Sequence, residues 1–232
     1  MPISLGVAEV LDRAQRGIRR FGVAGSVKRI ASLTGHSLAR TLYVRERHIW
    51  YALNLTAPVS QAICPPGFAL ALAAADDVAL LEELPTIGAH EARERRAAGA
   101  DLWLVREGAH AAFACWIFRE RTPVFAARHG WLSLPPNTVC LEDSVTSPAY
   151  RGRGLAGAAW SEIARGLQSQ HVAAIITKVA EDNAASRRAV EKAGFEPIAM
   201  MTLTRRGLRS QVELESYRVN PLTTFLHTAL SR

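Results

Sequence analysis

The spacing of hydrophobic positions predicts short strands over most of the second two thirds of the chain. Each predicted strand is an alternating or wholly apolar run bounded by turn residues. The runs cover residues 68–73, 102–106, 111–118, 139–145, 172–178, 195–204 and 211–219. Glu107-Gly108-Ala109 and Arg205-Arg206-Gly207 connect two of these pairs as hairpins, and residues 131–136 are predicted to be loop.

Helical spacing fills the gaps between these strands. A helix over 78–84 follows Asp76 as a candidate N-cap, and a charged helix covers 88–98. A third helix has an apolar stripe with a four-residue repeat, made by Leu155, Ala159, Ile163 and Leu167. A fourth covers 184–192, is capped by Asn183 or Asp182, and is stopped by Gly194.

The first fifty residues carry most of the positive charge. They hold nine Lys or Arg residues against three acids, whereas the whole chain has a formal charge of +7. Apolar residues at helical spacing predict a helix from residue 1 to about 55, and three prolines at 58, 65 and 66 indicate a linker. We therefore divide the chain into a basic helical extension, 1–58, and a main domain, 59–232.

The sequence allows three roles for residues 1–50. The helix can pack on the core or on a partner subunit as an ordinary solvated face, it can lie on an acidic membrane surface, or it can contact nucleic acid. Nucleic acid is the least favoured, because no basic strand with interleaved aromatic residues and no recognition-helix pattern is present. The sequence leaves the oligomeric state open, including a homo-oligomer.

Composition narrows the class of protein further. A chain of 232 residues with 49% hydrophobic residues can bury one sizeable core. No apolar run approaches eighteen residues, and the N-terminus lacks a signal-peptide layout, so we expect a cytoplasmic protein. Cys64, Cys115 and Cys140 are few and widely spaced, which indicates reduced thiols. No His-Glu-x-x-His or Cys-x-x-Cys spacing indicates a metal site.

The segment Tyr150-Arg151-Gly152-Arg153-Gly154-Leu155-Ala156 carries the clearest chemistry. It joins a predicted strand to a predicted helix, and its glycines let the backbone pass close to a ligand. The free N–H groups of the helix start would face that ligand, and the helix dipole favours an anion there. The segment therefore predicts a diphosphate site. A P-loop would need a Lys-Ser or Lys-Thr pair, which is absent, and a dinucleotide fingerprint would need an acid where Lys178 stands.

Arg151-x-x-Gly154-x-Ala156 resembles the Arg/Gln-x-x-Gly-x-Gly/Ala signature of the GNAT superfamily of acyl-CoA-dependent N-acetyltransferases. Asn183-Ala-Ala-Ser186, followed by Glu191-Lys-Ala-Gly-Phe195, is similar to the second cofactor segment of that family. The resemblance is specific from about 139 to 205. It implies a mixed α/β fold, with a mostly antiparallel sheet flanked by helices, to which the helical N-terminal extension is added.

The resemblance also implies which residues hold the co-substrate, acetyl-CoA or another acyl-CoA. The loop and helix start supply the diphosphate site, the end of the preceding strand lines the pantetheine arm, and the asparagine segment reaches the cofactor or caps its helix. These cofactor-binding residues are Val145, Thr146, Ser147, Arg151, Gly152, Arg153, Gly154, Leu155, Ala156, Asn183 and Ser186.

In GNAT enzymes a primary amine attacks the thioester directly, so a base must take its proton. The resemblance places a base on the strand before the signature, where Glu142 and Asp143 are the candidates. Strand alternation sends them to opposite faces unless a bulge intervenes. Glu142 is favoured because it shares parity with Cys140 and Ser144, a more polar set than Leu141 and Val145. The alternative is a carboxylate that only forms an ion pair.

One position departs from the family pattern. Many members carry a tyrosine seven residues after the asparagine, which protonates the leaving thiolate, whereas this chain has Val190. Ser186, Tyr150 or a water could serve instead, or the thiolate leaves unaided.

From the resemblance and the charge of residues 1–50 together, we expect an acetyltransferase acting on a small-molecule amine such as an amino sugar, in the cytoplasm and near the inner membrane. A long-chain acyltransferase using acyl-CoA or an acyl carrier protein, and a non-catalytic acyl-CoA-binding module, are the alternatives.

Overall fold

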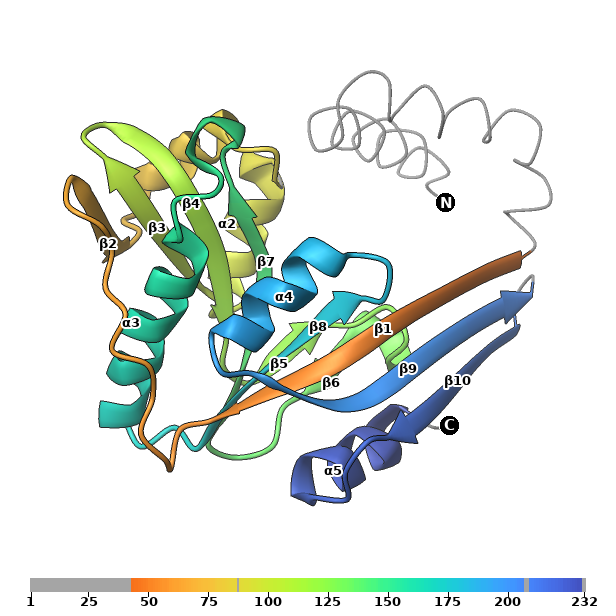
Figure 1. Cartoon of the computed structure of the whole chain (residues 1–232). Helices are drawn as coiled ribbons and strands as arrows, with labels where there is room; N and C mark the ends of the chain where they lie inside the picture. The colour runs from red at the N-terminus through yellow and green to blue at the C-terminus, as the bar shows by residue number, and fades with distance from the viewer. Residues whose placement is uncertain (1–42, 87, 207–208, 231–232) are drawn as a thin grey trace, which may run out of the picture.

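A computed structural model describes residues 43–86, 88–206 and 209–230, and these residues form one eight-stranded sheet with helices on both faces (Figure 1). The strand order is β10-β9-β1-β8-β7-β4-β3-β2. The strands are β1 (Tyr43–Asn54), β2 (Phe68–Leu72), β3 (Asp101–Glu107), β4 (His110–Phe118), β7 (Thr138–Thr146), β8 (Ala174–Ala180), β9 (Glu196–Arg206) and β10 (Arg209–Ser216).

The predicted mixed sheet, mostly antiparallel and flanked by helices, is confirmed. Of the neighbouring strands in this sheet, β7 and β8 run parallel, and the other pairs are antiparallel. The parallel pairing joins only 138–140 to 174–176, although both strands continue well beyond it. The two strands therefore separate after Cys140, and the sheet is open between their carboxyl ends.

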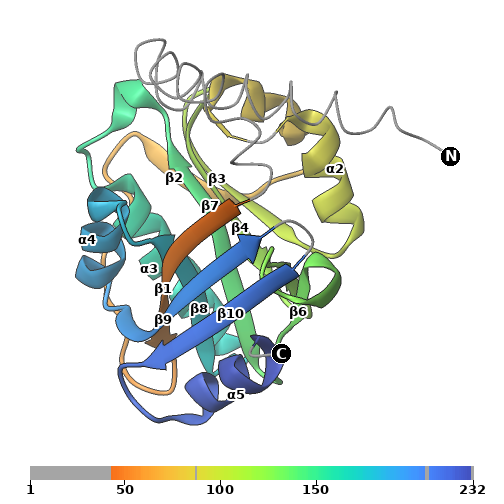
Figure 2. The same cartoon turned by 90° about the vertical axis from the view of Figure 1, so that its right-hand side faces the viewer.

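Helices cover the two faces of the sheet differently (Figure 2). The long helix α3 and the shorter α4 pack on one face, and α2, α5 and the 3-10 helix η1 pack on the other. A separate two-stranded hairpin lies outside the main sheet. The bounds are η1 (Asp76–Glu83), α2 (Ala89–Ala97), η2 (Arg128–Gly130), η3 (Pro148–Tyr150), α3 (Leu155–Ser169), α4 (Ala184–Lys192) and α5 (Pro221–Leu230), with β5 (Arg121–Pro123) and β6 (Trp131–Ser133) in the small hairpin.

The predicted apolar stripe of α3 is confirmed as its core-facing side. Leu155, Ala159, Ile163 and Leu167 are all buried. They pack with Trp160 of the same helix and with Phe113 and Phe195 from the sheet region, and the Trp160 ring meets each phenyl ring edge-on. This packing fixes where α3 begins, because Leu155 is its first residue and is itself anchored in the core.

The predicted N-terminal helix is wrong for residues 43–54. This segment is β1, a strand with β8 on one side and β9 on the other. Trp50 and Tyr51 point to opposite faces and are both fully buried, as expected of a central strand covered on both sides. Within the described residues the sheet therefore begins at Tyr43, before the predicted boundary at 58. Residues 1–42, the rest of the predicted extension, lie outside the described residues.

Two local predictions are also corrected. Residues 131–133, predicted as loop, form β6 and pair with β5. The predicted α-helix over 78–84 is the 3-10 helix η1, and Asp76 makes no capping hydrogen bond. The Asp77 carboxylate instead accepts from the N–H of Ala74, which precedes the helix, at 2.7 Å.

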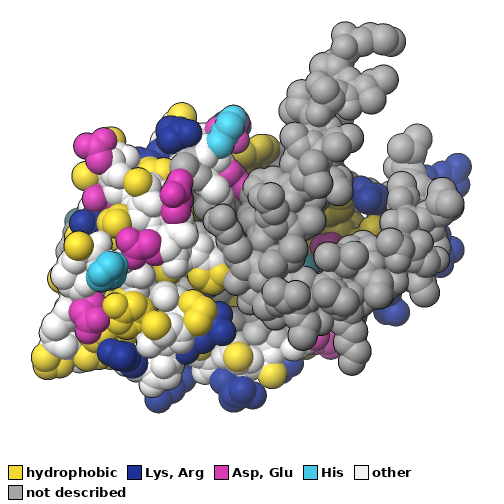
Figure 3. All heavy atoms as spheres, turned by 90° about the horizontal axis from the view of Figure 1, so that it is seen from above, with side chains coloured by type: hydrophobic (Ala, Val, Ile, Leu, Met, Phe, Trp, Pro, Cys, Tyr) yellow, Lys and Arg dark blue, Asp and Glu magenta, His cyan; other side chains and the backbone are white. Residues whose placement is uncertain are grey.

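The described surface carries mixed charge. Seen from above, acidic, basic and hydrophobic side chains are interspersed over the described part of the molecule (Figure 3). This agrees with the near balance of charges beyond residue 50. Within the described ranges, the helices are too short or too polar to cross a membrane.

Candidate acyl-CoA site

The loop between η3 and α3 has the backbone that an anion site requires. Gly152 and Gly154 both adopt left-handed conformations, with φ of 80° and 76°. Gly154 is the N-cap of α3, and no side chain caps the helix there. A Cβ built on either glycine would meet no atom within 4 Å, so the space in front of the loop is open. A non-glycine residue would be strained in this conformation and would project into that space.

The amide groups from Gly152 to Gly157 donate to no acceptor within the described residues. The first intrahelical bond of α3 runs from the N–H of Ala158 to the carbonyl of Gly154 at 3.1 Å. Unpaired N–H groups at a helix start carry a partial positive charge, and this favours an anion by about 0.3 to 2 kcal/mol. The residues present therefore fit a bound diphosphate.

The two arginines of the loop differ in their surroundings. Arg151 is exposed and forms no ion pair with a described residue. Arg153 lies over the ring of Tyr150, 5.2 Å from its centroid, and approaches Glu107 at 3.9 Å. Phe68 meets Tyr150 edge-on, so β2 and the loop are held together. Arg151 is thus the freer cation, whereas Arg153 also helps to order the loop.

Strand β7 contains a bulge at Asp143. This residue has φ of 46°, and the register against β4 shifts between Ala114 and Trp116. The bulge reverses the facing of the strand, because Leu141 lies on the α3 face whereas Val145 packs against the opposite core. Ser144 turns to the α3 face, where its Oγ accepts from the Trp160 indole at 3.1 Å. The predicted shared parity of Glu142 and Ser144 is therefore wrong.

The end of β7 offers less free backbone than predicted. The Ser147 N–H donates to Ala112 at 2.9 Å, and its carbonyl accepts from Tyr150 at 2.9 Å, so both groups are used in the turn. Val145 and Thr146 remain on the stretch that β8 no longer covers, and they pair with β4 on the other side. The open edge of β7 beyond Cys140 is thus the part available to an extended ligand.

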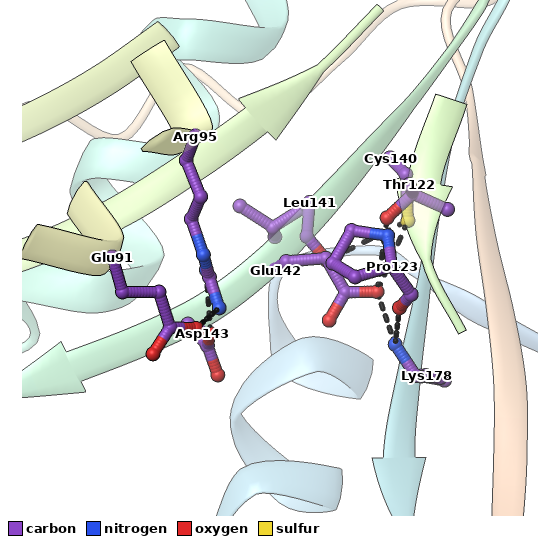
Figure 4. A network of polar contacts seen from close by, with 9 residues as sticks. All are labelled: Glu91, Arg95, Thr122, Pro123, Cys140, Leu141, Glu142, Asp143 and Lys178. Carbon is purple, nitrogen blue, oxygen red and sulfur yellow. Dashed lines mark hydrogen bonds and ion pairs between the residues drawn. The ribbon is translucent and has the colours of Figure 1, made fainter. Parts of the chain in front are cut away.

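Glu142 is the centre of a buried polar cluster (Figure 4). Its Oε1 forms an ion pair with Lys178 Nζ and lies 3.4 Å from the Thr122 hydroxyl and 3.5 Å from the Cys140 thiol. The side chains of Glu142 and Lys178 are only 10% and 16% exposed. Lys178 also donates to the Pro123 carbonyl at 3.3 Å. This pair bridges β7 and β8 at the place where their backbones separate.

The pKa of Lys178 is raised above its ordinary value. Burial alone would lower the pKa, but the adjacent Glu142 carboxylate outweighs it with smaller help from Cys140 and Asp143. Lys178 therefore stays charged at neutral pH. The Glu142 oxygen at the centre of the cluster is thus held by a permanently charged ammonium.

Asp143 lies beside Glu142 but has a different partner. Its carboxylate binds Arg95 of α2 at 2.6 Å, and Arg95 also binds Glu91 at 2.8 Å. Burial opposes the charged guanidinium, yet the two carboxylates raise the pKa of Arg95. Asp143 is 33% exposed, which makes it the more accessible of the two predicted bases. Both carboxylates are thus brought together, and each is occupied by a cation.

The asparagine segment behaves as a helix cap. Asn183 precedes α4, and its side chain accepts from the Ser186 N–H at 3.1 Å. This is the capping alternative considered for Asn183. Val190 is 3% exposed and packs in the core with Phe195. The position that carries a proton donor in many GNAT enzymes is therefore buried apolar packing in this chain.

Two residues of the cluster were missed by sequence reasoning. Lys178 and Arg95 come from β8 and α2, and each meets a β7 carboxylate across the fold. The one signal for Lys178 was a charge placed within an otherwise apolar strand. Arg95 gave no such signal, because charges are frequent on its helix.

Sequence comparison agrees with this geometry. The model of the acetyltransferase (GNAT) family matches residues 72–195, more than half of the chain, and the chain belongs to this family. The matched region begins after β1, so that strand lies outside it. A search of curated proteins found no match.

Two solved structures with TM-scores above 0.5 show the same fold at low sequence identity. A GCN5-related N-acetyltransferase from Sphaerobacter thermophilus is 14% identical with a TM-score of 0.51, over 88% of this chain and 69% of that one. A tandem GNAT protein from the clavulanic acid biosynthesis pathway is 15% identical with a TM-score of 0.51, over 77% and 59%. A GNAT-family protein from Novosphingobium aromaticivorans is 19% identical with a TM-score of 0.48, over 75% and 66%. The chain spans less than two thirds of the length of the last two.

Proposed function

We propose that this acetyltransferase moves an acetyl group from acetyl-CoA to a primary amine of a small molecule, such as an amino sugar, by direct attack. The observation that carries the proposal is the row of N–H groups from Gly152 to Gly157 that donate to no described acceptor, in the loop that follows the uncovered end of β7. Such a row suits the diphosphate of coenzyme A. Arg151 adds a cation that no described residue neutralises.

The opening between the strands supplies the second part of the site. The pantetheine arm is an amide chain, and an exposed strand edge offers it backbone donors and acceptors. In our proposal Val145 and Thr146 take this role, at the end of β7 that β8 does not cover. Ser147 contributes its hydroxyl, since its backbone groups are engaged. Asn183 and Ser186 contribute through the start of α4, which the asparagine caps.

The chemistry requires a neutral amine. An alkyl amine with a lysine-like pKa near 10.4 loses about 4–5 kcal/mol of driving force to deprotonation at pH 7. A positioned base removes that proton, and holding both reactants in place supplies much of the remaining acceleration. Direct proton abstraction by Glu142 or Asp143 stays a prediction, and each carboxylate already forms an ion pair, with Lys178 and Arg95 respectively.

The leaving thiolate needs less assistance. A thiol has a pKa of about 8.5, so its anion is a tolerable leaving group without an acid. Tyr150 is a candidate donor in the loop, and its side-chain hydrogen bond with Glu107 is the main cause that raises its pKa. The phenol is therefore protonated at neutral pH, as a donor must be. Loss of the usual tyrosine at Val190 then slows the reaction rather than abolishing it.

A non-catalytic acyl-CoA-binding role is the second candidate, because Val190 removes the usual proton donor. The cytoplasmic location and the contact of residues 1–50 with a membrane surface stay predictions. Most of that segment, 1–42, lies outside the described residues.

The deciding experiment measures transfer by the purified full chain. Acetyl-CoA and palmitoyl-CoA are each offered with glucosamine, spermidine, lysine and phenethylamine, and thiol release is followed together with the mass of the amine product. Amine-dependent thiol release with acetyl-CoA, and a product heavier by one acetyl group, is the expected result. Faster turnover with palmitoyl-CoA would indicate the long-chain alternative. Coenzyme A binding without any transfer would contradict catalysis and favour the binding module.

A further inference from the structure

His48 stands on the central strand β1, on the same sheet face as the Glu142–Lys178 pair. In the ladders it pairs with Ala180 of β8 and Met201 of β9, and its neighbour Trp50 pairs with Lys178. Residues two apart on a strand share a face, so His48 and Trp50 point the same way. The Lys178 ammonium lies 5.8 Å from the Trp50 ring centroid, which puts Lys178 on that face as well. His48 and Lys178 are thus diagonal neighbours.

The imidazole of His48 is half-buried and has a free nitrogen. Its Nδ1 is shielded from solvent and makes no hydrogen bond with any described residue. The charged groups that face it are Glu46 on β1, Lys178 on β8, Glu142 on β7 and Asp182 after β8. Burial is the largest influence and, with the positive charge of Lys178, outweighs the three acids, so the pKa of His48 lies below its ordinary 6.5. The ring is therefore neutral at pH 7.

A neutral imidazole differs from the two carboxylates beside it. Glu142 and Asp143 form ion pairs with Lys178 and Arg95, so protonating either carboxylate disrupts an ion pair. The Nδ1 of His48 has no hydrogen-bond partner among the described residues, and a neutral imidazole carries one ring nitrogen that can accept a proton. The ordinary pKa of an imidazole, about 6.5, is also closer to that of an alkyl ammonium than the ordinary pKa of a carboxylate, about 4.

The location suits the reaction. The diphosphate site lies at the start of α3, which packs on one face of the sheet. His48 and Lys178 lie on the other face. The opening between β7 and β8 connects the two faces. Acetyl-CoA that binds with its diphosphate at α3 and passes through the opening would present its thioester toward the face that holds His48.

We propose that His48 is the general base that takes the proton from the acceptor amine, directly or through one water. This inference rests on the proposed acetyl transfer. The acceptor ammonium gives a proton to a His48 ring nitrogen, the freed lone pair attacks the thioester carbonyl carbon, and the C–S bond breaks with its electron pair on sulfur. The second proton of the nitrogen ends on the coenzyme A sulfur, and the first passes from His48 to solvent. His48 lies on β1, outside residues 72–195 that match the family.

The test compares His48→Gln with His171→Asn as the control. His171 is exposed in the turn between α3 and β8, beyond the opposite end of that strand from Ala180, and Asn tolerates its left-handed backbone. With the panel amine that the wild type acetylates fastest, we expect kcat/KM to fall about 100-fold or more in His48→Gln. Coenzyme A affinity measured by calorimetry should stay within about twofold, because the loop is unchanged. The control should retain wild-type values.

The pH profile separates a base from a structural residue. A base must be neutral, so wild-type kcat/KM should fall as pH drops through the His48 pKa, below 6.5, and this limb should disappear in His48→Gln. An unchanged rate and limb in the variant would overturn the role of His48 while acetyl transfer stands. Absence of transfer by the wild type would overturn both proposals. Should His48→Gln fail to fold, NMR titration of the wild-type imidazole decides, and a pKa above 7 contradicts the proposal.

Discussion

The carboxylates on β7 and the loop before α3 are separated by only a few residues, yet they differ in whether their polar groups have partners. From Gly152 to Gly157 the backbone donors have no described acceptor, and the space before them is open. Glu142 and Asp143, by contrast, form ion pairs with Lys178 and Arg95. Unsatisfied groups held in place by a rigid element are what a ligand can use, whereas paired and buried groups stabilise the fold. From this comparison we infer that the loop binds the ligand and that the two carboxylates stabilise the fold.

The largest expected effect comes from breaking the buried pair. Lys178→Met leaves the Glu142 carboxylate buried without a cation, and we expect a loss of about 3–5 kcal/mol in the free energy of unfolding, measured by urea denaturation. The exposed pair of Arg218 and Glu196 is the matched control, since both side chains are more than 60% exposed. Arg218→Met should cost less than about 1 kcal/mol. Equal losses in the two variants would remove the structural role of the pair.

The same pair fixes a pH dependence. The folded pKa of Lys178 lies above its ordinary 10.5, so its contribution to stability is complete below that value. It is lost as pH rises through the higher folded pKa. The stability difference between the wild type and Lys178→Met should therefore be flat near neutrality and shrink above about pH 10.5.

A smaller effect is expected from the bulge. Asp143→Asn and Asp143→Ala both remove the charge that binds Arg95, but Asn tolerates a left-handed backbone and Ala does not. Thermal unfolding should therefore show Asp143→Ala less stable than Asp143→Asn by about 1 kcal/mol. Asp101, in a regular strand and paired with Arg119 at 2.9 Å, is the control. There the Ala and Asn variants should not show this order, and finding it there would remove the argument from the bulge.

The smallest effect concerns the direction of Ser144. Trp160→Phe keeps an aromatic ring in the core but removes the indole donor, and it should cost about 1 kcal/mol in urea unfolding. In a Ser144→Ala background the same change should cost less, since the hydrogen bond is already absent. Equal costs in both backgrounds would show that Ser144 does not turn toward α3.

Local chemistry made the loop predictable from sequence. Gly152 and Gly154 stand where the backbone must be left-handed, and the stripe from Leu155 to Leu167 forces a helix to begin there. Both signals act within a few residues, so they are visible without the fold. The strands of the main sheet from Phe68 onward were predictable for the same reason, since each is an apolar or alternating run, whereas the short strands β5 and β6 were missed.

Long-range contacts account for what the sequence did not show. Strand β1 is defined by two partners, β8 and β9, that come more than a hundred residues later, and the helical spacing of apolar residues at the start of the chain favoured a helix. The bulge at Asp143 depends on register against β4, so parity alone misplaced Ser144. The ion pairs of Lys178 and Arg95 join separate elements, and His48 came into view only once β1 was in the sheet.

A calorimetric titration of coenzyme A tests the central claim most directly. The wild type should release heat and bind, and Gly154→Ala should bind at least about tenfold more weakly, equivalent to about 1.4 kcal/mol. Gly99→Ala is the control, because Gly99 has φ of 82° and the same open surroundings but lies between α2 and β3. It should bind as the wild type does. No heat with the wild-type chain, or equal weakening by Gly99→Ala and Gly154→Ala, would contradict a diphosphate site at the start of α3.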